Sequence, residues 1–98
     1  MRKIEFADEA RDDLRKIAAY TIEYWGKAQA RRYLDGLRAT CAEIAAMPGL
    51  GKDVSWAAAG LRSFPCQSRV IYYRPEPQRI LVLAIVHRRQ DPTRRFPA

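Results

Sequence analysis

The side chains best suited to chemistry follow an apolar run near the end of the chain. Residues 80–86 read ILVLAIV, and the run ends in the polar cluster His87-Arg88-Arg89-Gln90. A run this apolar predicts a strand covered on both faces of a sheet, so the cluster should leave the core at a fixed point. After Lys52 every lysine-or-arginine position is an arginine: 62, 69, 74, 79, 88, 89, 94 and 95. Because arginine presents a planar fork of donors, this pattern favours an anionic or acidic partner.

One interpretation of these residues is catalytic. Metal-free RNA cleavage needs a base for the 2′-hydroxyl, an acid for the leaving oxygen and cations for the transition-state charge. The only histidine, His87, titrates near neutral pH, and the cations would be Arg62, Arg69, Arg74 and Arg88. The other interpretation is structural, because a lone histidine at the end of a buried strand is more often held by a hydrogen bond to neighbouring backbone or to Asp91.

The two cysteines do not predict a metal site. Cys41 falls on the apolar face of a predicted helix and Cys66 in a predicted strand, and neither has a second cysteine or a histidine at ligand spacing. We expect two buried thiols in a reducing compartment, with no metal and no cofactor.

A strand and two helices are predicted in the first half. Residues 1–6 alternate in polarity, which is typical of a short strand. Apolar residues spaced by three and four predict a helix over Asp8 to Trp25 and a second over about Lys27 to Met47. The stripe of the first helix includes Ala10, Leu14, Ile17, Thr21 and Tyr24. Gly26 is placed to end this helix in a left-handed conformation, and so short a link makes the helices antiparallel neighbours.

Three strands are predicted after a loop over residues 48–60. Residues 61–66 contain Pro65, which indicates an edge or a bulge. Residues 69–74 are rich in β-branched and aromatic side chains, and residues 79–87 form the central strand. Short turns make these strands an antiparallel meander. The order β-α-α-β-β-β predicts an α+β fold, a helix hairpin packed on a small, mainly antiparallel sheet, in a single domain spanning residues 1–98.

The aromatic residues carry their own expectations. Tyr72 and Tyr73 alternate across their strand, so one should pack under the hairpin while the other faces solvent or a partner. We expect Trp25 to pack the end of the hairpin. Trp56, in the loop, is a candidate contact residue.

The C-terminal residues are expected to be loosely held. One of Arg88 and Arg89 pairs with Asp91 and orders the chain there. Arg94 and Arg95 are expected in a mobile tail that ends in Phe96-Pro97-Ala98.

Charge is divided unevenly along the 98 residues. Residues 1–60 hold ten basic and nine acidic groups, a net +1, whereas residues 61–98 hold eight and two, a net +6. The cationic half suggests a nucleic-acid or acidic-protein partner, with a merely solubilising face as the alternative. An apolar fraction of 48% excludes a disordered chain. No run approaches the roughly 18–20 apolar residues of a membrane span, and Met1-Arg2-Lys3 leads into no signal peptide, so we expect the cytoplasm.

Taken together, the motifs resemble the ParE-type toxins of the RelE/ParE superfamily. The helix hairpin and loop carry Trp25-Gly26, Gln29-Ala30, Tyr33-Leu34 and Pro48-Gly49-Leu50-Gly51. The sheet carries Gly60-Leu61-Arg62, Val70-Ile71-Tyr72-Tyr73-Arg74 and Ile85-Val86 followed by the cluster at 87–91. The resemblance covers essentially the whole chain in the right order. It is carried by the set of motifs and not by any one of them.

The resemblance implies the toxin of a type II toxin–antitoxin pair, linked to plasmid stabilisation. It implies DNA gyrase as the target and a ParD-like antitoxin as partner, in a hetero-oligomer that binds operator DNA through the antitoxin. RelE-type members instead cleave messenger RNA on the ribosome, usually with a lysine cluster and a C-terminal tyrosine. Here the last lysine is Lys52 and the last tyrosine is Tyr73, which disfavours that alternative. A partner-binding module without toxicity is a third possibility.

The resulting hypothesis is a protein that inhibits by binding and has no catalytic residues. The residues expected to contact the target or the antitoxin are Arg62, Arg74, His87, Arg88, Arg89 and Gln90. If the protein were a nuclease, the catalytic set would be His87, Arg62, Arg74 and Arg88. An acidic, amphipathic antitoxin segment is expected along the exposed edge of the hairpin and the arginine-bearing edge of the sheet.

Overall fold

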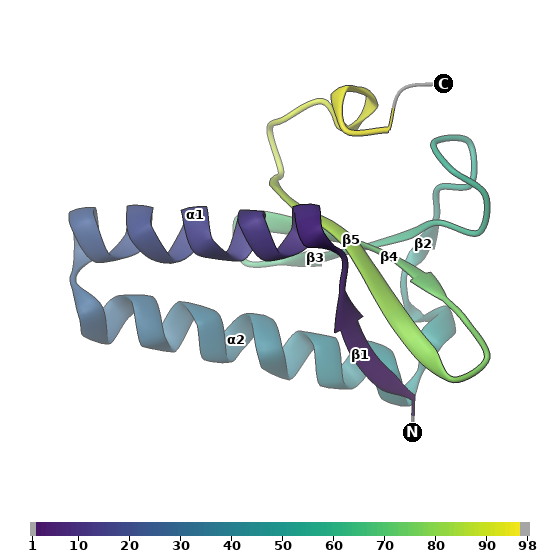
Figure 1. Cartoon of the computed structure of the whole chain (residues 1–98), viewed down its shortest axis with the longest axis horizontal. Coiled ribbons are helices and arrows are strands. Elements are labelled where there is room, and N and C mark those ends of the chain that lie inside the picture. The colour runs from purple at the N-terminus through teal and green to yellow at the C-terminus, as the bar shows by residue number, and fades with distance from the viewer. Residues whose placement is uncertain (1, 97–98) are drawn as a thin grey trace.

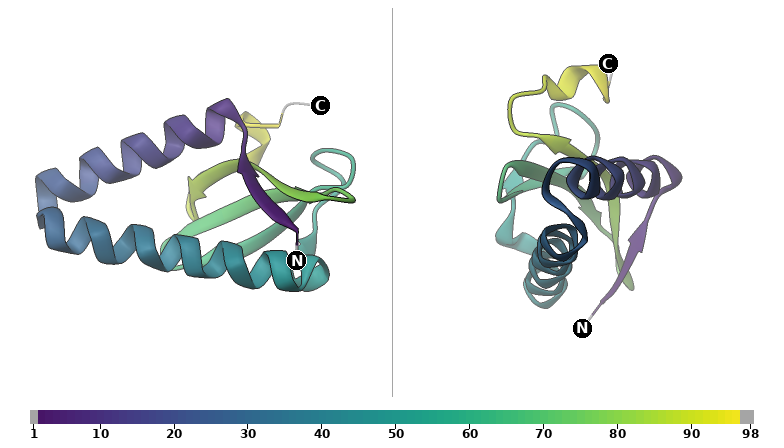
Figure 2. Two further views of the ribbon diagram at one scale, coloured as in Figure 1. Left: turned by 60° about the horizontal axis from the view of Figure 1, so that its bottom comes forward. Right: turned by 90° about the vertical axis from the view of Figure 1, so that its left-hand side faces the viewer.

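The structure is a computed structural model that describes residues 2–96. Helices α1 (Asp8–Trp25) and α2 (Lys27–Ala46) form the expected antiparallel hairpin, within one residue of the predicted bounds (Figure 1). Gly26 joins them with φ +88°, a conformation that side chains with a Cβ rarely adopt, and its N–H donates to Ile22 O at 3.0 Å. The helices meet at this glycine and splay apart toward the sheet (Figure 2).

The described residues form a five-stranded sheet in the order β1-β5-β4-β3-β2. Its strands are β1 (Lys3–Phe6), β2 (Lys52–Asp53), β3 (Arg62–Cys66), β4 (Arg69–Pro75) and β5 (Arg79–His87). The predicted meander is confirmed: β3, β4 and β5 pair antiparallel, while β1 joins β5 in parallel. Strand β2 lies in the predicted loop and pairs at only two positions, too few to show as a pattern in the sequence.

Strand β5 is covered on both faces, as its apolar run predicted. On one face, Ile80, Val82 and Ile85 pack with residues of both helices such as Ile17 and Leu37. On the other face, a second core contains Val54, Leu61, Tyr72, Ala84 and Val86, with Phe96 packed against it. The hairpin therefore covers one face, and the loop before β3 and the C-terminal segment cover the other.

Adjacent tyrosines belong to the two different cores. Tyr73 is fully buried on the hairpin side, as expected for one of the pair. Its hydroxyl accepts from the Gly51 N–H at 2.8 Å and donates to Pro48 O at 2.9 Å. The other tyrosine of the pair, expected to face solvent or a partner, is Tyr72. It is buried instead, because Phe96 returns to cover it, with ring centroids 5.4 Å apart.

The segment after β5 is held in place, so the expectation of a mobile tail is wrong for Arg94 to Phe96. Arg95 pairs with Asp13 of α1 through two nitrogen–oxygen contacts of 2.9 and 3.0 Å. Asp91 pairs with neither Arg88 nor Arg89, because its carboxylate accepts from the Thr93 N–H at 3.0 Å. That bond caps the 3₁₀ helix Pro92–Arg94 and lowers the pKa of Asp91. Residues 97–98, expected to end the tail, lie outside the described residues.

The closed end of the hairpin projects past the sheet (Figure 1). Tyr24, assigned to the apolar stripe, is consequently 62% exposed. Trp25, expected to pack the hairpin end, is 70% exposed. Both expectations fail for one reason: the apolar spacing of α1 continues for a turn beyond the point where the helix packs against the sheet.

Cys41 is expected to resist alkylation in the folded protein. Burial, and secondarily the neighbouring Cys66, raises the pKa of the Cys41 thiol to about 11, so almost none of it is the reactive thiolate at pH 8. We expect iodoacetamide to label Cys41 only as fast as the protein unfolds, and promptly in 6 M guanidinium. Peptide mass mapping checks this, and rapid labelling of native Cys41 would contradict it.

Candidate functional site

The residues proposed from the sequence fall at two ends of the sheet. His87 lies opposite Arg69 in the β4–β5 register, and the cluster 88–90 follows directly. Arg74 instead lies opposite Leu81, and Arg62 lies opposite Tyr73, toward the other end of the same strands. The structure therefore brings His87, Arg88, Arg89 and Gln90 together and separates Arg62 and Arg74 from them. No single surface contains all six.

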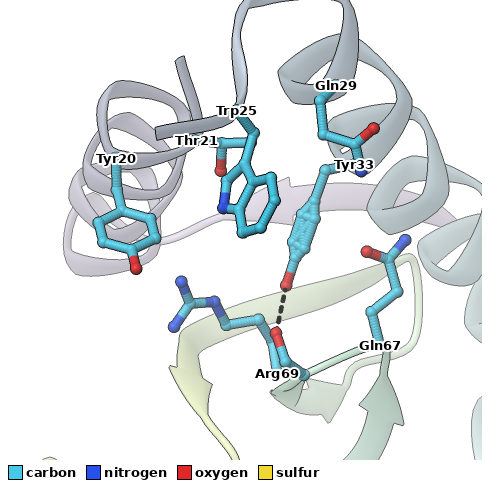
Figure 3. A pocket seen from close by; sticks show the side chains of 8 residues that line it. Tyr20, Thr21, Trp25, Gln29, Tyr33, Gln67 and Arg69 are labelled. Carbon is cyan, nitrogen blue, oxygen red and sulfur yellow. Dashed lines mark hydrogen bonds between the residues drawn. The ribbon is translucent and has the colours of Figure 1, made fainter. Parts of the chain in front are cut away.

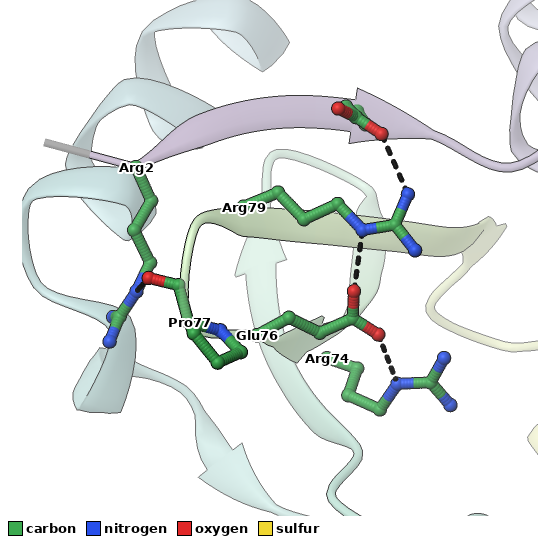
Figure 4. Close-up of polar contacts among 6 residues, drawn as sticks. Arg2, Arg74, Glu76, Pro77 and Arg79 are labelled. Carbon is green, nitrogen blue, oxygen red and sulfur yellow. Dashed lines mark hydrogen bonds and ion pairs between the residues drawn. The ribbon is translucent and has the colours of Figure 1, made fainter.

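Arg74 belongs to a charge network at the β4–β5 turn (Figure 4). Its Nε donates to Glu76 Oε2 at 3.1 Å, and Arg79 donates to the other oxygen of the same carboxylate. Arg79 also reaches Glu5 of β1, with Nη1 and Oε2 2.7 Å apart. These bonds, led by that from Arg79, lower the pKa of Glu76 and raise that of Arg79. The network ties the turn to β1, so Arg74 already has an anionic partner.

Arg62 is likewise engaged within the fold. Its Nη1 donates to Gly51 O at 2.6 Å and lies 3.5 Å from Gly49 O, so the guanidinium holds the loop after α2 against β3. An arginine that satisfies loop carbonyls is structural. The predicted contact role therefore rests mainly on the opposite end of the sheet.

At that opposite end, the backbone holds His87. Its Nδ1 accepts from the Arg89 N–H at 3.2 Å, and its own N–H donates to Gln90 Oε1 at 3.2 Å. The predicted hydrogen bond to neighbouring backbone is present, whereas Asp91 is engaged elsewhere. Burial, and then Arg69, Arg89 and Arg88, lower the pKa of His87, which keeps the ring neutral at pH 7.

Arg88, Arg89 and Gln90 are exposed just past the end of β5. Within residues 2–96, neither arginine pairs with a carboxylate, and only their backbone N–H groups are bonded, Arg88 to Ser68 O and Arg89 to His87. This turn therefore presents two unpaired guanidinium groups on a short, well-fixed loop. Such an arrangement can bind carboxylates or phosphates of a partner.

Beside this turn lies a groove that the sequence did not reveal. A cavity of about 270 Å³ separates the closed end of the hairpin from the β3–β4 turn. Figure 3 shows side chains from both helices pointing toward the strands, where the guanidinium of Arg69 lies. The lining residues are Tyr20, Thr21, Trp25, Gln29, Tyr33, Gln67, Ser68 and Arg69. A contiguous hollow adds Lys16, Ile17 and His87.

Comparison with known proteins identifies the family. The sequence model of the ParE toxin of the type II toxin–antitoxin system parDE matches residues 4–92. A protein named Toxin ParE, from Escherichia coli, is 40% identical over 84 residues, covering 85% of this chain and 82% of that protein. The chain belongs to the ParE toxin family. A second relative, Toxin ParE1 from Caulobacter vibrioides, is 32% identical and covers 89% of this chain and 90% of its own length.

Solved structures show the same fold. A chain from the chromosomal ParDE toxin–antitoxin system of P. aeruginosa superposes with a TM-score of 0.75 at 16% identity, covering 89% of this chain and 96% of that one. A chain of the RelBE2 toxin–antitoxin complex from Mycobacterium tuberculosis gives 0.56 at 19% identity, covering 89% and 98%. The predicted RelE/ParE-like α+β fold is confirmed.

Across residues 2–96, no group of three or more His, Cys, Asp and Glu side chains is arranged to hold a metal ion. None of the described helices is both long and apolar enough to cross a bilayer. At the β5 end of this ParE-family chain, the polar side chains that lie together are those of His87, Arg88, Arg89 and Gln90.

Proposed function

We propose that the chain is a toxin that binds and inhibits DNA gyrase in the cytoplasm and is neutralised by a ParD-like antitoxin. The observation that carries the proposal is the family match over nearly the whole chain, from residue 4 to residue 92. Relatives named as ParE toxins at 40% and 32% identity support it. The antitoxin is proposed to form a hetero-oligomer with the toxin and to supply the contact with operator DNA.

The turn after β5 is the proposed contact with the target. Arg88 and Arg89 are exposed and have no carboxylate partner among the described residues, while Gln90 and His87 hold the turn through their hydrogen bonds. Two guanidinium groups on a fixed turn suit acidic side chains or the phosphates of DNA bound to gyrase. Arg62 and Arg74 have a smaller part, because loop carbonyls and Glu76 already occupy them.

One observation favours messenger RNA cleavage as a second candidate. A histidine with lowered pKa beside Arg69, Arg88 and Arg89 combines a base with cations. The Nδ1 atom is already occupied by the Arg89 N–H, so only Nε2 is open to a substrate. Under the binding hypothesis, His87→Ala removes one hydrogen bond that holds the turn and lowers toxicity only in part. Under the cleavage hypothesis, it abolishes toxicity.

The deciding experiment is gyrase supercoiling of relaxed plasmid with the purified chain. We expect inhibition that excess antitoxin reverses. The variant Arg88→Glu/Arg89→Glu should lose at least about tenfold in potency, because two favourable contacts become repulsive. A matched control, Lys27→Glu/Arg31→Glu, makes the same charge change on exposed positions of α2 and should retain potency.

Two outcomes would contradict the proposal. Unchanged supercoiling at a large molar excess of the chain would remove gyrase as the target, and cleavage of messenger RNA in cells would then assign the second candidate. Equal loss in both charge-reversed variants would show that net charge, and not the turn after β5, determines inhibition.

A further inference from the structure

Arg69 is the half-buried arginine for which residues 2–96 supply no partner. Arg62, Arg74, Arg79 and Arg95 are bonded to loop carbonyls or carboxylates. Arg88, Arg89 and Arg94 are exposed and therefore solvated. The Nε of Arg69 is buried and has no hydrogen-bond acceptor within the described residues. A buried N–H without an acceptor is costly, so the Nε of Arg69 is better satisfied when an anion enters the groove.

The wall facing Arg69 is aromatic and largely unburied. Trp25 is 70% exposed and Tyr20 is 54% exposed, although both line the groove. Tyr33 is fixed there by its hydroxyl, 3.2 Å from Ser68 Oγ (Figure 3). Tryptophan, tyrosine and arginine are the residues that most often dominate the binding energy of protein interfaces. Their concentration in one groove indicates a protein partner whose apolar side chains the rings would cover.

Charge defines the partner further. The residues that line the groove and its contiguous hollow include Lys16, Arg69 and His87 but no aspartate or glutamate. An incoming carboxylate thus meets two cations, Lys16 and Arg69, without any like-charge repulsion from the walls. Nucleic acid would also satisfy Arg69. The apolar character of the rings favours one acidic and one apolar side chain of a peptide.

We propose that this groove binds an acidic segment of the ParD-type antitoxin. A carboxylate of the segment pairs with the guanidinium of Arg69, and an adjacent apolar side chain packs between Trp25 and Tyr33. The inference rests on the proposed function for the identity of the partner. It adds that the antitoxin site centres on the hairpin end and Arg69, whereas the target contact lies on the turn at Arg88 and Arg89.

The test measures antitoxin affinity of the full chain and of two variants, with the purified ParD-type antitoxin as the probe. Arg69→Gln removes the charge, and Trp25→Ala removes an exposed ring whose loss leaves the core intact. We expect each substitution to raise the dissociation constant of the complex by at least about tenfold. The matched controls are Arg31→Gln and Trp56→Ala, both exposed and away from the groove, and both should stay within about twofold.

A second measurement reports contact directly. Trp25 and Trp56 are the only tryptophans, so Trp56→Phe leaves Trp25 as the sole indole emitter. Antitoxin binding should shift its emission to shorter wavelength, because the ring leaves water. An unshifted spectrum in a complex that has formed would overturn the proposal, whatever the effect of Arg69→Gln on folding.

The results separate this inference from the proposed function. Supercoiling inhibition retained by Trp25→Ala but poorly reversed by antitoxin supports both. Native-like antitoxin affinity in both groove variants overturns the groove as the antitoxin site and leaves the proposed function unaffected. An antitoxin that does not bind the native chain overturns both. Tight binding of a labelled single-stranded oligonucleotide that is lost in Arg69→Gln, with antitoxin affinity unchanged, assigns the groove to nucleic acid and overturns the inference.

Discussion

Replacing Gly51 by alanine is expected to destabilise the protein by about 1–3 kcal/mol, the usual cost of forcing an extra carbon into a packed site. A Cβ at this position would lie 2.5 Å from the Tyr73 hydroxyl oxygen and 2.8 Å from Ser63 O. The second obstacle is backbone of β3 and cannot swing aside. The first is the hydroxyl that accepts from the Gly51 N–H and donates to Pro48 O, so displacing it also breaks one buried and one partly buried hydrogen bond. Urea unfolding followed by circular dichroism measures the loss.

Gly36→Ala provides the matched control for the same substitution. In this case the Cβ would meet the amide end of Gln67, an exposed and flexible side chain that can move away. Gly36 lies in the interior of α2, where alanine is favoured over glycine by about 1 kcal/mol. We expect this variant to be as stable as the native protein or more so. If both alanines cost the same, the close approach at Gly51 would not be the cause.

The packing around Gly51 also explains what Arg62 does. The same loop that offers its N–H to Tyr73 offers Gly51 O to the guanidinium at 2.6 Å. The carbonyl and the amide of one residue thus fasten the loop to β3 and to β4. The loop leads into β2 and then to Val54, which packs in the second core. Arg62 therefore serves the fold first, although in the sequence it looks identical to the arginines that are free.

Most of the fold could be predicted because its signals are local. Apolar residues spaced by three and four predicted the helices, and Gly26 predicted their junction. The run at 80–86 set β5, and its complete apolarity correctly required cover on both faces. What could not be predicted was which segment supplies the second cover. Phe96 and the loop before β3 do so, and no local pattern links Phe96 to Tyr72 across the intervening strand.

The site was less predictable, because arginine carries no mark of its partner. Arg74 and Arg88 differ only in what the fold brings near them: Glu76 in the first case and solvent in the second. The prediction that Trp25 packs the hairpin end failed for a similar reason, since the apolar spacing of a helix does not show where the sheet beneath it ends. The sequence does not show the register of β4 and β5, that is, which of their residues lie opposite one another. Once Arg69 is known to lie opposite His87, the groove beside the hairpin end follows.

Asp13 joins three segments that are distant in sequence. Its Oδ2 accepts from the Ile85 N–H at 2.9 Å, beyond the point where β1 stops pairing with β5 at Phe6 and Val82. Both of its oxygens also pair with Arg95, and this contact raises the pKa of the guanidinium. The Asp13 side chain is 13% exposed and that of Arg95 is 27% exposed, so solvent screens the pair only partly. This carboxylate therefore fastens the C-terminal segment and closes the open edge of β5.

Asp13→Ala is accordingly expected to cost about 2–4 kcal/mol, more than Arg95→Ala. Removing the carboxylate abolishes a charge-assisted pair and also leaves the Ile85 N–H without its acceptor. Removing the guanidinium abolishes the same pair and only a longer contact of 3.7 Å with the exposed Glu9. A double-mutant cycle should give a coupling of about 1–3 kcal/mol between the two residues, measured by urea unfolding. A control at Asp12, which pairs with Arg15 on the exposed side of α1, should show less than about 0.5 kcal/mol.

The same variants also show whether the Asp13–Arg95 pair supports the second core. Phe96 follows Arg95 directly and covers Tyr72, so release of Arg95 should expose that ring. We expect both single variants to lose the near-ultraviolet signal of the packed tyrosine while keeping helical circular dichroism, because α1 and α2 pack on the other face of the sheet. If Arg95→Ala left Tyr72 packed, the aromatic contact would hold the segment by itself. Equal costs for the two alanines would then place the stability in the ion pair and not in the Ile85 hydrogen bond.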